Sequence, residues 1–226
     1  MPVISIPVNR PCIRQHWPDR VFADEAAKWR AVVAEVERLH ALRRPVLVGT
    51  RIVLASERLW QALGERGLEA RVLNVTRLKE EAEIVALAGE PGGVVIATNM
   101  AGRGTDIKLG RGVAALGGLH VLATERHESG RVDRQLFGRA GRQGDPGSAQ
   151  AWVSVEDELI RRYLPRAARE ALNFALHARP RGWEAAAHSA FALTQKRAQT
   201  LAARQRQAVL RSDTWLEESL SFAQTH

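Results

Sequence analysis

The apolar run GVVIAT (Gly93–Thr98) and the glycine-rich stretch NMAGRGTDIKLG (Asn99–Gly110) that follows it decide the fold expected for this chain. A short apolar run bounded by glycine is typical of a strand that is buried on both faces. Comparable runs recur on either side of it. Further strands are predicted at Pro45–Gly49, Glu69–Leu73, Leu119–Thr124 and Gln150–Ser154.

Helical patterns separate these runs. One amphipathic helix begins after Asp24, a plausible N-cap, and carries apolar residues at helical spacing as far as Leu39. Further helices are predicted at Ser56–Arg66 with Ser56 as N-cap, at Lys79–Ala88, and at Gly130–Ala140. Strands that alternate with helices need crossover connections, so we predict an α/β fold with a mostly parallel sheet and flanking helices.

The chain divides into three parts by composition. Residues 1–22 are rich in proline and read as an extended linker that enters the domain. Residues 23–160 hold the alternating strands and helices. In residues 161–226 the strand signals vanish, and a helical tail is expected, with two or three helices broken near Pro165 and Pro180–Gly182.

The overall composition excludes several classes of protein. The 226 residues are 45% hydrophobic, enough for a core, yet no apolar run is long enough to span a membrane. The start, MPVISIPVNRP, does not resemble a signal peptide. With Cys12 as its one cysteine, the chain can form neither an intramolecular disulfide nor a cysteine zinc cluster. We expect a cytoplasmic protein.

The positive charge is concentrated in the tail. The net charge is +8, of which residues 161–226 contribute +6 from eleven basic and five acidic side chains. A basic helical tail could meet nucleic acid or an anionic membrane surface. A bias of composition is the alternative, because 29 of the 33 basic residues are arginine, as a GC-rich genome would produce.

A second glycine cluster, Gly138–Gly147, carries the candidate chemistry. Arg139 and Arg142 are three residues apart, which on a helix places them on one face, and Gly138 and Gly141 would let another surface approach closely. Two guanidinium groups so placed could bind a polyphosphate, as an arginine finger does. The alternative is two solvated arginines in a loop.

The first cluster places Asp106 after the tight turn that Gly102 and Gly104 allow. Its carboxylate could accept from a ribose hydroxyl, orient a metal-bound water, or pair with a neighbouring arginine. Because both clusters are read as following strands, they are expected at the carboxyl ends of the sheet, where ligands bind in such folds.

Other chemistry has little support. No Gly-Lys dipeptide exists, so the chain lacks a P-loop. Glu125 and Glu158 follow strands and could imitate a magnesium-site acid, but solvated residues are the simpler interpretation. The histidines lack metal-ligand spacing, so no metal site is predicted, and His127 is expected to serve an interface or a hydrogen bond. Cys12 has no plausible general base nearby.

Three stretches carry a resemblance to a known family. VVIATNMAGRGTDIKLG (Val94–Gly110), TERHES (Thr124–Ser129) and QLFGRAGRQGDPG (Gln135–Gly147) resemble the helicase-type motifs in the second nucleotide-binding domain of the SecA protein-translocating ATPases. The resemblance covers roughly residues 3–163, and Gln195–Gln207 is similar to the start of the family's helical scaffold.

The resemblance implies a RecA-like lobe, like the C-terminal lobe of helicases, that closes on ATP or ADP. It implies that Arg139 and Arg142 reach the γ-phosphate as catalytic residues. The implied nucleotide-binding residues are Gly102, Arg103, Gly104, Thr105, Asp106, Gln135 and Gln143. Mg²⁺ would be bound mainly by a first lobe, which carries the P-loop and is the principal partner. Preprotein and a membrane channel are further possible partners, nucleic acid is not expected, and the location would be cytoplasmic or peripheral at the inner face of the cell membrane.

The sequence departs from the family at several points. Phe137 stands where arginine is usual and Ile52 where serine is usual, and the family's Tyr-Asp-Asp stretch and cysteine-rich zinc tail have no counterpart. The alternatives are therefore a lobe of a nucleic-acid helicase and a standalone regulatory or binding module.

Overall fold

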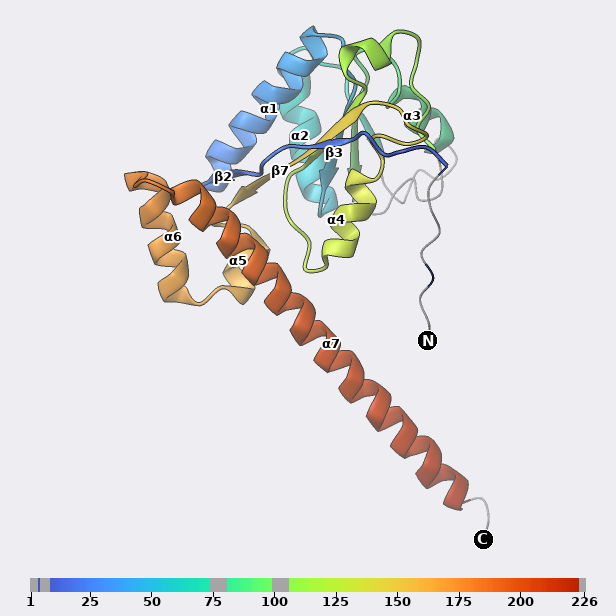
Figure 1. The fold of residues 1–226 in the computed structure, drawn as a ribbon, viewed down its shortest axis with the longest axis vertical. Helices are drawn as coiled ribbons and strands as arrows, with labels where there is room; N and C mark the ends of the chain where they lie inside the picture. Colours follow the sequence, from blue (N-terminus) through green and yellow to red (C-terminus); the bar gives the residue numbers. More distant parts are fainter. Residues whose placement is uncertain (1–3, 5–8, 74–80, 99–105, 224–226) are drawn as a thin grey trace.

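The centre of the molecule is a parallel sheet (Figure 1). The computed structural model describes residues 4, 9–73, 81–98 and 106–223, with the backbone alone for residues 81–82 and 213–223. The seven strands run β1-β7-β6-β3-β5-β4, with β2 also paired to β7, and every pairing is parallel. Their bounds are β1 Gln15–His16, β2 Arg20–Phe22, β3 Val46–Thr50, β4 Arg71–Leu73, β5 Val94–Thr98, β6 Leu119–Ala123 and β7 Gly147–Ser154. The predicted α/β class with a mostly parallel sheet is confirmed.

Helices pack on both sides of the sheet, some between consecutive strands and three in the tail after β7. They are α1 Glu25–Ala41, α2 Val53–Gly64, α3 Glu81–Leu87, the short 3₁₀ helix η2 Val113–Leu116, α4 Gly130–Phe137, α5 Glu158–Tyr163, α6 Arg166–Ala178 and α7 Trp183–Ala223. The N-cap predicted at the start of α1 is confirmed, because the Asp24 carboxylate accepts the Ala27 N–H at 2.6 Å. Residues 79 and 80 of the predicted third helix lie outside the described residues.

The N-cap predicted for α2 is wrong. The helix starts at Val53 after Ile52, which has an extended backbone and makes no side-chain cap hydrogen bond. Ser56 lies inside the first turn, where its Oγ donates to the Val53 carbonyl at 2.6 Å.

Side chains that alternate along the strands contribute to two hydrophobic cores, one on each face of the sheet. On one face, α1 and α2 pack on Val46, Val48, Ile96, Leu122 and Trp152. On the other, α3, α4 and the tail helices pack on residues that include Leu47, Val95, Val121, Ala151 and Val153. Burial on both faces explains the uninterrupted apolar runs of the strands.

The segment before α1 contributes to the sheet. Residues 1–22 were expected to be a linker, yet β1 pairs with Ser148–Ala149 and β2 with Trp152–Ser154. Hydrogen bonding therefore joins these two short strands to β7, and they form the edge of the sheet on that side.

The tail is helical as predicted, with breaks at Pro165 and between Arg179 and Gly182. The helices α5 and α6 gather where β7 ends, and α7 crosses the body before it extends away from it (Figure 1). Leu172, Leu176, Ala187 and Phe191 bury the tail in the second core. The described side chains from Arg204 to Ser212, by contrast, are all exposed.

Candidate functional site

The loop between α4 and β7 carries both candidate arginines. The helix predicted over residues 130–140 ends at Phe137, and Gly138 caps it. Gly141, Gln143 and Gly144 then adopt positive φ values of 66°, 54° and 80°. Arg139 and Arg142 therefore lie in a tight loop and do not share a helix face, because three glycines in seven residues favour turns over helix.

This arginine loop, residues 138–146, lies at the amino end of the sheet. It leads directly into Gly147, the first residue of β7, whereas the expectation placed it after a strand. The segment that follows Asp106 is near the same edge, since the Gly110 N–H donates to the carbonyl of Gly89 just before β5. For the arginine loop, the expected position at the carboxyl ends of the strands is therefore wrong, because the crossover helix α4 has already carried the chain back to the amino end. Of the first cluster, residues 102–105 lie outside the described residues.

Arg142 and Asp106 form the contact that joins the two glycine clusters. Arg142 Nη1 lies 2.9 Å from Asp106 Oδ1, and Arg142 Nε donates to the Gly138 carbonyl at 2.9 Å. The two side chains are 35% and 40% exposed. An ion pair this exposed is worth at most about 1 kcal/mol, so its main effect is to orient the guanidinium group. Of the three roles open to Asp106, the structure shows the pairing with an arginine.

The other predicted residues are distributed around this pair. Arg139 is half-buried in the turn after α4, and its N–H donates to the Leu136 carbonyl. Gln135 is exposed on α4, and the Gln143 carbonyl accepts from Arg10 Nη1 at 3.3 Å. Gly102, Arg103, Gly104 and Thr105 lie outside the described residues.

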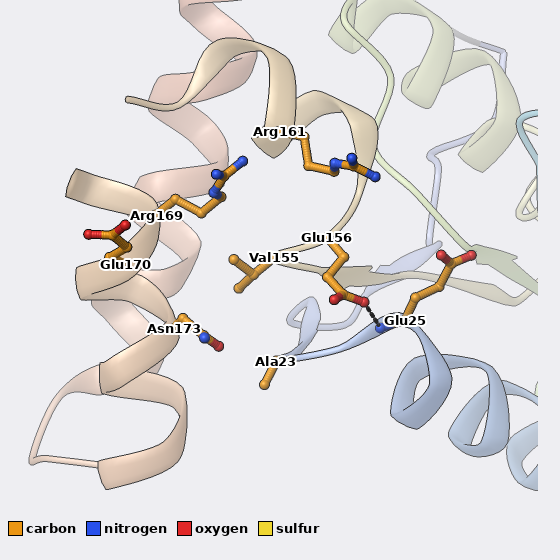
Figure 2. Close-up of a pocket in the computed structure, with 8 residues that line it drawn as sticks. All are labelled: Ala23, Glu25, Val155, Glu156, Arg161, Arg169, Glu170 and Asn173. Atoms are coloured by element: carbon orange, nitrogen blue, oxygen red, sulfur yellow. Dashed lines mark hydrogen bonds between the residues drawn. The ribbon is translucent and has the colours of Figure 1, made fainter. Parts of the chain in front are cut away.

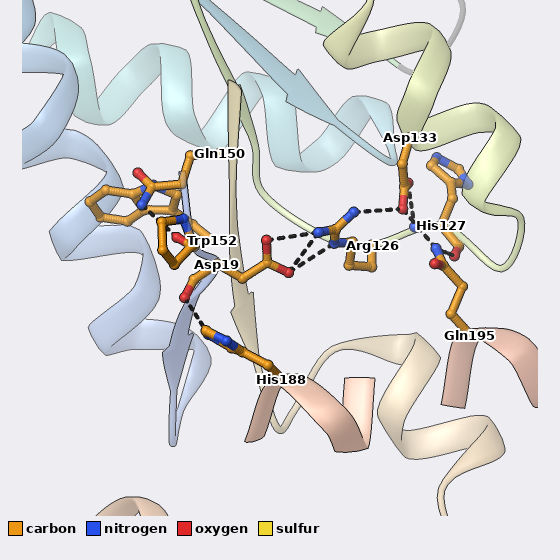
Figure 3. A network of polar contacts seen from close by, with 9 residues as sticks. Asp19, Arg126, His127, Asp133, Gln150, Trp152, His188 and Gln195 are labelled. Atoms are coloured by element: carbon orange, nitrogen blue, oxygen red, sulfur yellow. Dashed lines mark hydrogen bonds and ion pairs between the residues drawn. The ribbon is translucent and has the colours of Figure 1, made fainter. Parts of the chain in front are cut away.

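A polar network around Arg126 was not predicted (Figure 3). Its guanidinium group pairs with both carboxylate oxygens of Asp19, the closer at 2.7 Å, and reaches Asp133 at 3.3 Å. Burial favours the neutral form of Arg126, but these two carboxylates outweigh it and raise its pKa. Phe137 lies beneath the same group, 5.3 Å from its centre, so the phenylalanine that departs from the SecA pattern packs against this network.

Helix α7 joins the same network. Gln195 Nε2 donates to Asp133 Oδ2 and to the His127 carbonyl, each at 2.7 Å, and a ring nitrogen of His188 lies 2.9 Å from the Asp19 carbonyl. The backbone N–H of His127 donates to Asp133 Oδ1 at 2.9 Å, a contact that does not depend on the histidine side chain. The one signal in the sequence is Arg126 itself, the arginine of the motif TERHES. Its partner Asp19 is too distant in the sequence to be inferred.

The carboxyl edge of the sheet holds a second charged region. Lys28 and Asp157 form a buried pair at 2.5 Å, and burial raises the pKa of Asp157 to about 7 although Lys28 opposes this. Burial also raises the pKa of Glu125. Glu158 instead reaches Arg51 at 3.2 Å and is half-exposed. Within the described ranges, no group of three or more acidic, histidine or cysteine side chains could hold a metal ion.

Two adjoining cavities of about 480 and 560 Å³ open at this edge. Figure 2 shows the smaller one, where Arg161 and Arg169 face Glu25 and Glu156 across the gap between the tail and α1. Glu156 accepts the Glu25 N–H at 2.7 Å. The charges in the lining are mixed, so the cavities favour neither an anion nor a cation.

A model of the SecA P-loop domain family matches residues 11–114 and 110–176. The chain belongs to the SecA family. The match includes Arg126 with Asp19 and Asp133, the Arg142–Asp106 pair and β7, so the resemblance seen in the sequence is confirmed.

Curated SecA relatives align closely with this chain. It is 56% identical over 163 residues to protein translocase subunit SecA 2 of Bacillus thuringiensis subsp. konkukian (strain 97-27), which is 72% of this chain and 21% of that protein. It is 45% identical over 223 residues to protein translocase subunit SecA 2 of Bordetella avium (strain 197N), which is 99% of this chain and 34% of that protein. This SecA-family chain thus spans about a fifth to a third of the length of these relatives.

Solved structures share its fold. The Escherichia coli DEAD-box protein SrmB, in complex with RraA, matches 69% of this chain and 88% of its own with a TM-score of 0.53 at 24% identity. The yeast DEAD-box splicing factor Prp28 gives 0.53 over 74% of this chain and 35% of its own at 19% identity. These matches confirm the RecA-like fold of this SecA-family chain. In the part of the chain that the structure describes, no helix is both long and apolar enough to cross a membrane.

Proposed function

We propose that this chain is the second RecA-like lobe of a SecA-type ATPase that couples ATP hydrolysis to protein translocation. The observation that carries the proposal is the Arg142–Asp106 pair, which joins the two motifs of the SecA resemblance at one partly exposed place. Residues 23–160, together with the strands β1 and β2 that pair with β7, would form the lobe, and residues 161–226 a helical scaffold that braces it. Preprotein and a membrane channel would be partners of the complete motor, which would work in the cytoplasm or at the inner face of the membrane.

The residues at the pair fit a nucleotide phosphate. A guanidinium group offers several N–H donors in one plane and binds phosphate oxygens in a fork. Contacts to Gly138 and Asp106 hold that plane in place, so little ordering is needed when a phosphate arrives. When ATP is bound, it supplies the γ-phosphoryl group whose negative charge the arginines would stabilise.

Each candidate has a distinct role in this proposal. Arg139 and Arg142 would contact the γ-phosphate, Asp106 would hold Arg142 and reach the nucleotide, and Gln135 and Gln143 would flank it. Gly102–Thr105 would contribute backbone contacts. Mg²⁺ would be held mainly by the first lobe, which brings the P-loop that this chain lacks. We expect the isolated chain to bind ATP or ADP weakly and not to hydrolyse it.

The test is ATP turnover by the complete motor, in which a P-loop lobe accompanies this chain. Arg139→Ala and Arg142→Ala should each lower kcat a hundredfold or more, because an arginine that stabilises transition-state charge is worth about 10³–10⁵ in rate. Arg204→Ala, on the exposed part of α7, is the matched control and should leave kcat unchanged.

Two results would count against the proposal. A rise in KM with kcat unchanged would mean that the arginines bind the ground state and the transition state equally. Robust magnesium-dependent turnover by the isolated chain would show that it contains a complete active site of its own.

A further inference from the structure

The segment Arg10–Arg14, called here the strap, runs alongside the arginine loop. Its alternate side chains donate to three carbonyls of that loop. Arg10 Nη1 reaches Gln143 at 3.3 Å, Cys12 Sγ reaches Gly141 at 3.6 Å, and Arg14 Nη1 reaches Ala140 at 3.0 Å. These carbonyls lie on both sides of Arg142. Immediately after the strap, β1 pairs with the start of β7, which prolongs the contact.

The shapes of the strap and the loop are also matched. A Cβ atom placed on Gly141 would lie 2.6 Å from Arg14 Cβ, closer than carbon atoms can approach, and 3.2 Å from Arg14 Cα, which is also tight. A Cβ atom on Gly144 would lie 3.3 Å from Arg10 Cβ. The sequence suggested that a glycine here lets another surface approach, and the surface that approaches Gly141 is the chain's own strap.

The backbone conformation of the arginine loop is one that contacts from outside the loop would stabilise. Gln143 holds a φ of 54°, which is unfavourable for a residue with a side chain, and the two glycines beside it have a wide choice of conformations in the unfolded chain. Inside the loop, the Asp145 N–H donates to the Arg142 carbonyl at 2.9 Å, and the strap adds contacts from outside it.

We propose that the strap positions Arg142, with Arg14 as the principal positioning residue. Arg14 is half-buried, whereas Arg10 and Cys12 are exposed and their hydrogen bonds compete with water. Arg14 acts through Arg142 and does not touch the reacting atoms. The inference rests on the proposed function, because it assigns Arg142 its catalytic contact, and a misplacement of about 1 Å can cost on the order of a hundredfold in rate.

The first test is a double-mutant cycle in the complete motor. Arg14→Ala should lower kcat about tenfold and leave KM for ATP within about twofold, since the phosphate contact is lost mainly in the transition state. Arg14→Lys, which keeps a donor at this position, should recover most of the rate. In an Arg142→Ala background, Arg14→Ala should have no further effect, because the residue through which it acts is gone.

If Arg14→Ala lowers kcat by the same factor with and without Arg142, the proposal is wrong. It is also wrong if kcat stays as low in Arg14→Lys as in Arg14→Ala. Arg204→Ala serves as the matched control, as an exposed arginine on α7. Thermal unfolding curves of the variants verify that each of them is still folded at the assay temperature.

The second test does not depend on ATP. Hydrogen–deuterium exchange of the Asp145 amide in the 226-residue chain reports whether the arginine loop is held. Arg14→Ala should speed exchange of the Asp145 amide about tenfold and leave exchange of the Leu122 amide in β6 unchanged. If the Asp145 amide exchanges at the same rate in the variant and in the unmodified chain, the strap does not hold the loop and the proposal is wrong. If Arg142→Ala turns out to have wild-type turnover, the proposed function fails, and this exchange result alone decides whether the strap holds the loop.

Discussion

His120 is a fully buried histidine on β6, packed against Trp17 with ring centroids 4.9 Å apart. Its Nδ1 lies 2.7 Å from Ser148 Oγ, and its Nε2 has no hydrogen-bond partner among the described residues. Burial, with help from Arg44 and Arg38, lowers its pKa to about 3 from an ordinary value of 6.5. The ring is therefore neutral in the folded chain over a range of pH in which the unfolded chain would bind a proton.

This difference predicts a loss of stability in acid. Because the folded pKa is depressed, the loss begins as the pH falls below 6.5 and grows toward pH 3. Between pH 7 and 4.5 the chain should lose about 2–3 kcal/mol more than the His120→Gln variant. Urea unfolding at both pH values measures this. Parallel losses in the two proteins would mean that His120 does not cause the acid sensitivity.

Gly141 has to satisfy two constraints, a left-handed backbone and the closeness of Arg14. Gly112 has a φ of 84° and nothing within 4 Å of a Cβ, so it carries the first constraint alone. Gly112→Ala should cost about 1–2 kcal/mol from the backbone. Gly141→Ala should cost about 1–3 kcal/mol more, from overpacking against the strap. Chemical denaturation compares the two, and equal costs would show that the strap moves aside freely.

At the scale of elements, Phe191 fixes α7 to the body. It is 3% exposed in the core shared with α6 and the sheet, while Phe174 on α6 is 73% exposed. Phe191→Ala should therefore lower the free energy of unfolding by about 3–5 kcal/mol. Phe174→Ala, the matched control, should change it by no more than about 0.5 kcal/mol. A small effect at Phe191 would mean that the polar contacts of Gln195 and His188 hold the helix.

The strands β3 to β7 and the tail helices could be predicted closely, but β1, β2, the helix ends and the site could not. Apolar runs buried on both faces leave little doubt about where β3, β5 and β6 lie. The start of α2 was missed because Ile52 precedes the helix without a polar cap, while Ser56 offered a capping side chain four residues after the cap position. The arginine loop was placed at the wrong edge because it was taken to follow a strand directly, whereas α4 lies between β6 and the loop.

The contacts of the site could not be predicted because they join residues that are far apart in the sequence. Arg126 depends on Asp19, which is 107 positions away, and the strap contacts span 126 to 133 positions. No periodicity in the sequence records such pairs. The pairing of Arg142 with Asp106 was one of three open alternatives, and it too spans 36 positions.

At the scale of the whole molecule, α7 supports the fold only along its first part. Ala187, Phe191 and Ala198 are buried, whereas every described side chain from Arg204 to Ser212 is exposed. A chain that ends at Ala203 should unfold within about 0.5 kcal/mol of the 226-residue chain, since it loses no buried contact among the described residues. A chain that ends at Gly182 should lose most of its stability. Urea denaturation of the two truncations checks both statements.

The pairing of β1 and β2 with β7 has a consequence for the order of folding. Gln15 pairs with Ser148 and Phe22 with Ser154, so the strands of this sheet that are synthesised first are among the last that can pair. Pairings this remote in sequence slow folding, because the entropy of closing a long loop is lost before the contacts form. At a synthesis rate of about 5–20 residues per second, the nascent chain would wait on the order of ten seconds for β7. The strap and the arginine loop would thus come together only after the rest of the sheet has been made.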